Sequence, residues 1–145
     1  SLQLEHAETV LSADPKSQQD FIVRMEVFFA GLLDKYIENR ETLKIMSREF
    51  EQLLPGGDDS VVNAMITTSF AIAEFIKRAK ELSFVRPDVD PDIVAGLLVD
   101  RLDNQARYVD SHKLFFGTST LDPDYRRHWV QATLGIVFNG INSRD

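Results

Sequence analysis

The sequence predicts an all-α domain, and three observations carry that prediction. Apolar residues recur three and four positions apart along nearly the whole chain, and no window keeps the strict alternation of a half-buried strand. Asp-Pro pairs begin at Asp14, Asp90 and Asp122 and mark helix starts, because Asp accepts hydrogen bonds from free backbone N–H groups and Pro loses none at the first helical position. The composition, 43% hydrophobic and 27% charged, is ordinary for a globular domain of 145 residues.

Charge and composition exclude several classes of protein. The chain has 16 basic and 23 acidic side chains and a net charge of −7, so this segment alone is not expected to bind the phosphates of DNA. It has no cysteine, which excludes disulfides and thiol chemistry. No apolar run is long enough to span a membrane and no signal peptide is visible, so we expect a cytoplasmic protein without membrane contact.

The first expected helices are read from their apolar faces. A helix with one apolar face is expected over residues 2–12. We interpret residues 1–13 as the remainder of a connecting helix from an absent upstream domain, and residues 14–145 as the main domain. A helix over residues 15–38 has two apolar stripes, which predicts neighbours on two sides. Asn39 is placed to cap a third helix over residues 40–54, which Pro55-Gly56-Gly57 ends.

The remaining helices follow from equally local signals. A helix from about residue 60 to Phe84 is apolar all round between residues 64 and 76, which is typical of the centre of a domain. The helix over residues 91–116 begins at Asp90-Pro91, has Val89 and Val94 placed as a hydrophobic staple, and ends at Gly117. The last helix, from Pro123 to about Asn142, begins at the same Asp-Pro-Asp phrase.

The last two helices carry more apolar surface than one copy needs. A terminal helix normally buries one face, yet the helix that begins at Pro123 has two apolar stripes and the small residues Ala132, Gly135 and Gly140. We therefore predict a four-helix bundle between two copies, with an isologous interface; the alternative is that all of this surface is internal core. The predicted interface residues are Val94, Leu98, Arg101, Gln105, Tyr125, Trp129, Ala132, Thr133, Ile136, Val137 and Gly140.

A second group of bulky side chains lies on the helices between residues 15 and 84. Aromatic and methionine side chains in such numbers either fill a core or line a cavity for an apolar ligand, and spacing alone favours the core. Thr67, Thr68 and Ser69 add hydroxyls to an apolar helix, and the carbonyl one turn back often satisfies such groups.

No catalytic chemistry is predicted. His6, His112 and His128 are isolated, and no metal, phosphate or dinucleotide motif is present, so we predict no enzyme, no metal and no cofactor. The run Asp100, Asp103, Asn104, Arg107 and Asp110 is either a carboxylate cluster or a solvated face with an Asp103–Arg107 ion pair, and we favour the latter. A helical enzyme or carrier remains a third class, which would require a buried titratable pair in a cleft.

Several sequence motifs together resemble those of the C-terminal domain of tetracycline-repressor-type (TetR-family) regulators. They are Phe28-Phe29-x-x-Leu32-x-x-x-Tyr36, Asn39-Arg40-Glu41-x-Leu43 with Arg48-Glu49, Phe84-Val85-Arg86-Pro87-Asp88-Val89-Asp90-Pro91-Asp92 before a long helix, and the closing helix from Tyr125 to Ile141. The resemblance covers nearly the whole chain, but the family's N-terminal helix-turn-helix is absent from it.

The resemblance implies a regulatory domain that binds a ligand and dimerises. The intact protein would be a DNA-binding homodimer, usually a repressor, that contacts DNA only through the missing N-terminal domain. A small apolar or amphipathic effector would occupy a cavity and shift the affinity for DNA; the alternative is a helical dimerisation module with a filled core and no ligand. The implied ligand-binding residues are Met25, Phe28, Phe29, Leu32, Met46, Phe50, Met65, Thr68, Ser69, Ile72 and Asn104.

Overall fold

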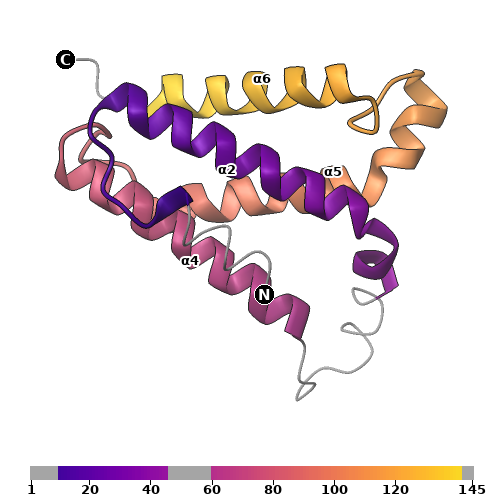
Figure 1. The fold of residues 1–145 in the computed structure, drawn as a ribbon, viewed down its shortest axis with the longest axis horizontal. Coiled ribbons are helices and arrows are strands. Elements are labelled where there is room, and N and C mark those ends of the chain that lie inside the picture. Colours follow the sequence, from indigo (N-terminus) through magenta and orange to yellow (C-terminus); the bar gives the residue numbers. More distant parts are fainter. Residues whose placement is uncertain (1–9, 46–59, 142–145) are drawn as a thin grey trace.

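The computed structural model describes residues 10–45 and 60–141, and within these ranges the fold is helical without any β-strand. This confirms the predicted all-α class. Four long helices, drawn in Figure 1, account for most of the described chain: α2 (Gln18–Glu38), α4 (Ser60–Glu81), α5 (Pro91–Phe116) and α6 (Pro123–Ile141). Residues 40–45 are also helical, as predicted, whereas most of the first and third predicted helices lies outside the described residues.

Helix α2 lies at the centre of this arrangement. It contacts both α5 and α6, and α5 in turn contacts α4. Figure 1 shows α6 along one side of α2 and α4 on the opposite side. The two apolar stripes predicted for α2 are explained by this position, because the helix buries residues toward neighbours on more than one side.

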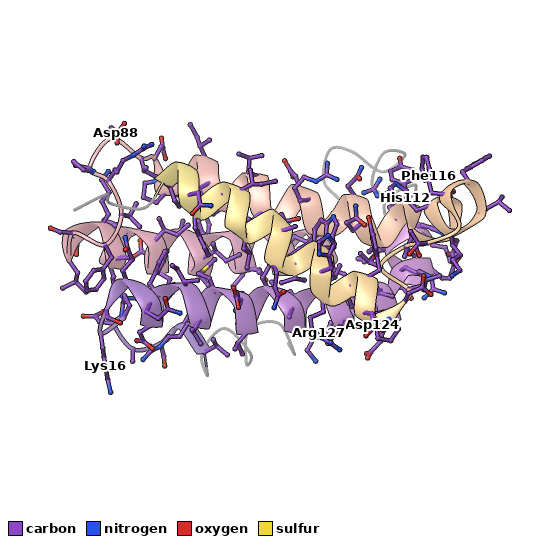
Figure 2. All side chains as sticks on the ribbon, turned by 90° about the horizontal axis from the view of Figure 1, so that it is seen from above. Lys16, Asp88, His112, Phe116, Asp124 and Arg127 are labelled. Atoms are coloured by element: carbon purple, nitrogen blue, oxygen red, sulfur yellow. The ribbon has the colours of Figure 1, made fainter. Side chains whose placement is uncertain are left out.

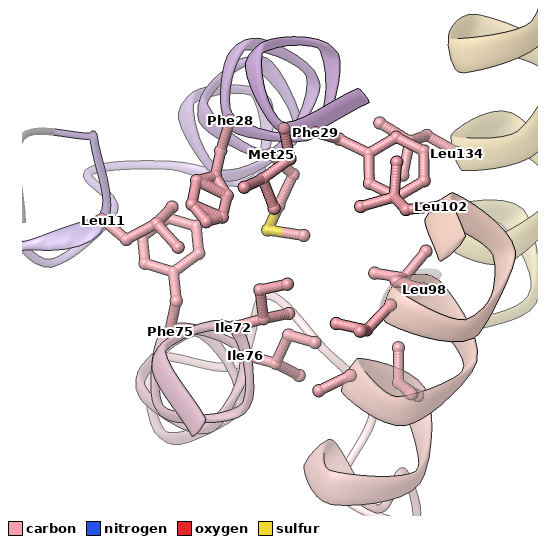
Figure 3. Close-up of a cluster of buried hydrophobic side chains, with 14 of the residues drawn as sticks. Leu11, Met25, Phe28, Phe29, Ile72, Phe75, Ile76, Leu98, Leu102 and Leu134 are labelled. Atoms are coloured by element: carbon pink, nitrogen blue, oxygen red, sulfur yellow. The ribbon is translucent and has the colours of Figure 1, made fainter. Parts of the chain in front are cut away.

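A single hydrophobic core joins the four helices. Figure 3 shows Met25 and Phe28 of α2 facing Ile72 and Phe75 of α4, while Leu102 of α5 and Leu134 of α6 enter from another side. Apolar burial of this extent is the main stabilising term in a domain of this size. The core side chains with no exposed surface include Phe21, Met25, Phe28, Leu32, Leu33, Ile72, Phe75, Ile76, Leu98 and Leu102.

The start of α2 differs from the prediction by three residues. Ser17, not Asp14, caps the helix: its Oγ accepts the Asp20 N–H at 3.0 Å, and the helix begins at Gln18. Asp14 instead forms an ion pair with Arg78 of α4 at 2.9 Å. Both Asp and Ser are good N-cap residues, so the sequence contains two possible helix starts, Asp14 and Ser17. The Asp14 carboxylate is engaged by Arg78, and Ser17 is the residue that caps the helix.

The end of α4 contains a backbone conformation that is unfavourable for its residue. The Phe84 N–H donates to the Ala79 carbonyl and the Ser83 N–H to the Lys80 carbonyl, which is the Schellman pattern of a helix terminus. This pattern places Ser83 at φ 66°, in the left-handed region. The helix therefore ends at Glu81, before the predicted Phe84.

Replacing Ser83 with Gly should stabilise the protein. A residue with a Cβ is disfavoured in the left-handed region and glycine is not, so we expect Ser83→Gly to raise the free energy of unfolding by about 1 kcal/mol. The matched opposite change is Gly117→Ala at φ 75°, which should lower it by a similar amount. Urea denaturation of both variants checks the pair, and a loss of stability in Ser83→Gly would contradict this account of the turn.

Helix α5 begins and ends where the sequence predicts. The Asp90 side chain accepts the N–H groups of Asp92 and Ile93 at 3.0 and 3.4 Å, and Pro91 is the first helical residue. Gly117 closes the helix in the left-handed conformation. Val89 and Val94, the predicted hydrophobic staple, are both buried.

The loop before α6 uses Asp122 differently from Asp90. The Asp122 carbonyl accepts the Arg126 N–H at 2.8 Å, as at a helix start, but its carboxylate turns back to Lys113, Thr118 and the Ser119 N–H. The hydrogen bond from Lys113 lowers the pKa of Asp122, and the Ser119 N–H acts in the same direction. The carboxylate therefore fastens the α5–α6 loop to the last turn of α5.

Candidate functional site

The outer face of α6 is the most unusual surface of the described residues. Val130, Leu134 and Phe138 are buried against the core, while Ile136 on the opposite side of the helix is 77% exposed. No Asp, Glu, Lys or Arg occurs between His128 and Ile141, although 27% of the chain is charged. An exposed helix face without charge is typical of a contact surface, because a solvated face is normally lined with charged and polar residues.

A second outward stripe runs along α5. Ile93 is 65% exposed, Leu97 54% and Tyr108 49%, and these residues recur at helical spacing on the side away from the core. Asp100 and Arg101 are the exposed charges near the middle of this stripe and have opposite signs. The Arg101 guanidinium donates to Asn104 Oδ1 at 3.3 Å, so its orientation is held along the helix.

Helices α5 and α6 both lie on one side of the core (Figure 3). Leu102 of α5 and Leu134 of α6 approach the core from neighbouring positions in Figure 3, which places both helices on the side away from Leu11 and Phe75. The ends of the two helices are also connected, because the Arg86 N–H just before α5 donates to the carbonyl of Ile141 at 3.0 Å. We call the combined surface, centred on Ile93, Leu97, Tyr108, Ala132, Ile136 and Gly140, the α5–α6 face.

Three helical glycines on α5 and α6 have no packing reason within one copy. A Cβ built on Gly96, Gly135 or Gly140 would meet no heavy atom within 4 Å beyond its own helical backbone. Glycine in a helix costs about 1 kcal/mol relative to alanine. Contacts within the described part of one chain do not offset this cost at the three positions.

The structure separates the predicted interface residues into two groups. Ala132, Ile136, Gly140 and Arg101 are exposed, and Tyr125, Trp129, Thr133 and Val137 are half-buried, with the Trp129 ring stacked on Phe29 at a centroid distance of 5.8 Å.

The other group faces inward and requires a correction. Val94, Leu98 and Gln105 are 8%, 0% and 6% exposed, so they belong to the core of their own copy. The outward stripe of α5 is instead Ile93, Leu97 and Tyr108, one position away in the first two cases. Ile93 and Leu97 have the same spacing as Val94 and Leu98. Because both members of each adjacent pair are apolar, the sequence does not determine which member faces the core.

The predicted ligand-binding residues that the structure describes are mostly core residues. Met25, Phe28, Phe29, Leu32, Thr68 and Ile72 are at most 2% exposed. Met65, Ser69 and Asn104 are partly exposed, and Met46 and Phe50 lie outside the described residues.

Two hollows in the described surface are lined by other residues. One, of about 320 Å³, lies between α2 and the start of α6 and is lined by Ala30, Asp34, Pro123, Arg126, Arg127 and Val130. The second, of about 260 Å³, is lined by Ala73, Glu74, Lys77, Lys80, Pro91 and Asp92. Arg126 is already engaged by Asp34 at 2.9 Å and by the Thr120 carbonyl, so the first hollow has no spare buried cation.

The carboxylates of α5 are paired with cations rather than gathered into a site. Asp103 binds Arg107 at 2.9 Å, which confirms the predicted ion pair, and Asp110 binds Arg40 at 3.1 Å. Within residues 10–45 and 60–141, no three acidic or histidine side chains are grouped as metal ligands. In the same part of the chain, no helix combines the length and hydropathy needed to cross a membrane.

Comparison with known proteins adds no assignment. The chain matches no protein-family model, and none of the curated proteins matches it.

Proposed function

We propose that this chain is the dimerisation and sensing half of a transcriptional regulator, and that two copies pair through the α5–α6 face. The observation that carries the proposal is the exposed, uncharged outer face of α6, with Ile136 at its centre. Burial of apolar surface stabilises a protein or complex by about 25 cal/mol for each Å² removed from water. A second copy of the same face covers it and makes the contact self-complementary.

Charge favours this face over other surfaces. Each copy carries a net charge of −7, so two copies repel one another over most approaches. At the middle of the α5–α6 face the exposed charges Asp100 and Arg101 have opposite signs, so this part of the face adds no net charge. Gly96, Gly135 and Gly140, where an added Cβ would meet no other atom within 4 Å, would let a partner helix approach closely, which gives them a role that contacts within one copy do not provide.

The regulatory part of the proposal rests on the resemblance to TetR-family domains. A helix-turn-helix upstream of this chain would bind DNA as a dimer, and a small apolar or amphipathic effector would favour one relative orientation of the two heads. By linkage, the effector then weakens operator binding by the same factor by which the operator weakens effector binding.

Substitution of Ile136 with Asp tests the pairing. In an isologous dimer each substitution places a carboxylate in the contact twice, so we expect Ile136→Asp to shift the chain from two copies to one at micromolar concentration, measured by sedimentation equilibrium. The matched control is Ile66→Asp, which places the same change at an exposed site on α4 and should keep the parental mass. A parental chain that is already monomeric, or an Ile136→Asp variant that stays dimeric, would exclude this interface.

The burial of the predicted ligand-binding residues favours a second candidate, a dimerisation module with a filled core. Phe28 and Leu32 have no exposed surface, and neither of them lines the hollows described above. A thermal-shift panel of fatty acids and aromatic compounds separates the candidates, because a ligand that binds only the folded state raises the melting temperature. Stabilisation by any compound that Phe28→Trp abolishes supports sensing, and a uniformly unchanged melting temperature supports the filled core.

A further inference from the structure

The C-terminal end of α5 holds three consecutive large apolar side chains in water. Leu114, Phe115 and Phe116 are 78%, 76% and 73% exposed, and we call these residues the α5 tip. Figure 2 shows the Phe116 end of α5 projecting at one extremity of the molecule, with His112 beside it. The ring centroids of His112 and Phe116 lie 5.3 Å apart in an edge contact.

The exposure of the tip does not come from a frayed helix end. The Gly117 N–H donates to the Lys113 carbonyl at 3.0 Å, and the Lys113 ammonium contacts both oxygens of Asp122 at 3.0 and 3.1 Å. Arg126 of α6 donates to the Thr120 carbonyl at 2.6 Å. The last turn of α5 and the loop after it are therefore tied together, and the three side chains stay in water on an ordered support.

The helical phase places Phe115 on the α5–α6 face. Positions eleven apart are separated by about three helical turns and share a face. Ile93, Asn104 and Phe115 form one such series, and Leu97 and Tyr108 form another beside it. Phe115 therefore extends the outward stripe of α5, while Leu114 and Phe116 flank it.

We propose that the α5 tip packs on the opposite end of the face of a second copy, against the partner's Ile93 region. This inference rests on the dimer proposed above. In the proposed arrangement the two-fold axis lies in the plane of the contact and perpendicular to α5. The two α5 helices then run antiparallel, and the tip of one copy meets the turn where the partner's α5 begins. The hydrogen bond from Arg86 to Ile141 shows that the start of α5 and the end of α6 lie together, so the tip meets Ile93 beside Ile136 and Gly140.

Area and charge agree with this occupant. A stable dimer buries about 800 Å² on each partner. Phe115, about three-quarters exposed, adds about 150 Å² of apolar surface to a face otherwise made of scattered residues, and Leu114 and Phe116 flank it. No charged side chain occurs from Leu114 to Leu121, so the tip brings no unpaired charge into the contact.

Truncation of the tip tests its contribution. We expect Phe115→Ser with Phe116→Ser to raise the dimer dissociation constant about 100-fold, because both copies lose the contact. The matched control, Phe70→Ser, changes a phenylalanine of α4 that is 64% exposed and should leave the constant unchanged. Melting curves of both variants in an Ile136→Asp background show whether folding of the single copy is intact.

Cysteine cross-linking tests the placement, since the chain has no cysteine of its own. Ile93 and Phe115 of one copy are about 33 Å apart along α5, too far for a short bismaleimide. Chains with Ile93→Cys mixed with chains with Phe115→Cys should therefore give a covalent dimer, whereas either variant alone should not.

Four outcomes would overturn the proposal. A dimer that forms normally without the two phenylalanines, or Phe115→Cys chains that cross-link with one another, contradicts the placement while the proposed dimer stands. Binding to phosphatidylglycerol vesicles that requires Phe115, with an unchanged dissociation constant, would assign the tip to a lipid surface. A monomeric parent chain removes the dimer itself, and the tip contact with it.

Discussion

Leu98→Ala should lower the free energy of unfolding by about 3 kcal/mol, while Leu97→Ala should leave the folding of a single copy nearly unchanged. The two leucines are neighbours on α5, but Leu98 has no exposed surface and Leu97 is 54% exposed. Truncation of a buried leucine removes its transfer free energy and leaves a cavity, whereas truncation at a solvated position removes little. The pair thus tests which stripe of α5 faces the core.

The measurement requires a background in which association does not contribute. Urea denaturation in the Ile136→Asp variant reports folding alone, and there Leu97→Ala should change stability by less than about 0.5 kcal/mol. In the parent chain Leu97→Ala should instead weaken dimerisation. Equal losses for the two leucines in the monomeric background would contradict the assignment of inward and outward stripes.

Phe21→Ala should have the largest effect of any single truncation proposed here, about 4 kcal/mol. Phe21 has no exposed surface. Its ring centroid lies 5.3 Å from that of Phe75 of α4 and 5.4 Å from that of Phe138 of α6. One side chain thereby joins three helices, and its removal leaves a cavity that no single neighbour fills.

The control for Phe21 lies on the same helix. Val27 is 53% exposed, and Val27→Ala should change stability by less than about 0.5 kcal/mol. Phe21→Leu keeps much of the volume and should lose roughly half as much as Phe21→Ala. If Phe21→Ala unfolds at the parental urea concentration, the three-helix junction does not stabilise the fold.

Helix boundaries were predictable where one local signal acts alone. Asp90, Pro91 and Gly117 define α5 at both ends, and the structure follows them. Before α2 there are two candidate N-caps, Asp14 and Ser17. Asp14 forms an ion pair with Arg78, a long-range contact that a local sequence pattern does not predict. The end of α4 at Glu81 likewise depends on a left-handed serine, which is uncommon enough that sequence reasoning passes over it.

The candidate site was predictable in its location but not in its detail. On α6 the spacing separates a buried stripe, Val130, Leu134 and Phe138, from an outer side that includes Ala132, Ile136 and Gly140. Along α5 the adjacent pairs Ile93-Val94 and Leu97-Leu98 are chemically equivalent, and only the positions of α2 and α4 decide which member is buried. The sequence predicts the α5 tip only as the end of a helix, because it gives no measure of how far a helix extends beyond its neighbours.

The contacts between α2 and α6 have a consequence for the order of folding. Asp34 and Arg126, which bind each other across these helices, are separated by 92 positions, and Phe21 meets Phe138 over a still longer stretch of chain. During synthesis the first long helix emerges well before its partner exists. The apolar side of α2 that faces α6 is covered by its native neighbour only after α6 has been synthesised, so a chain truncated before α6 would leave this side exposed.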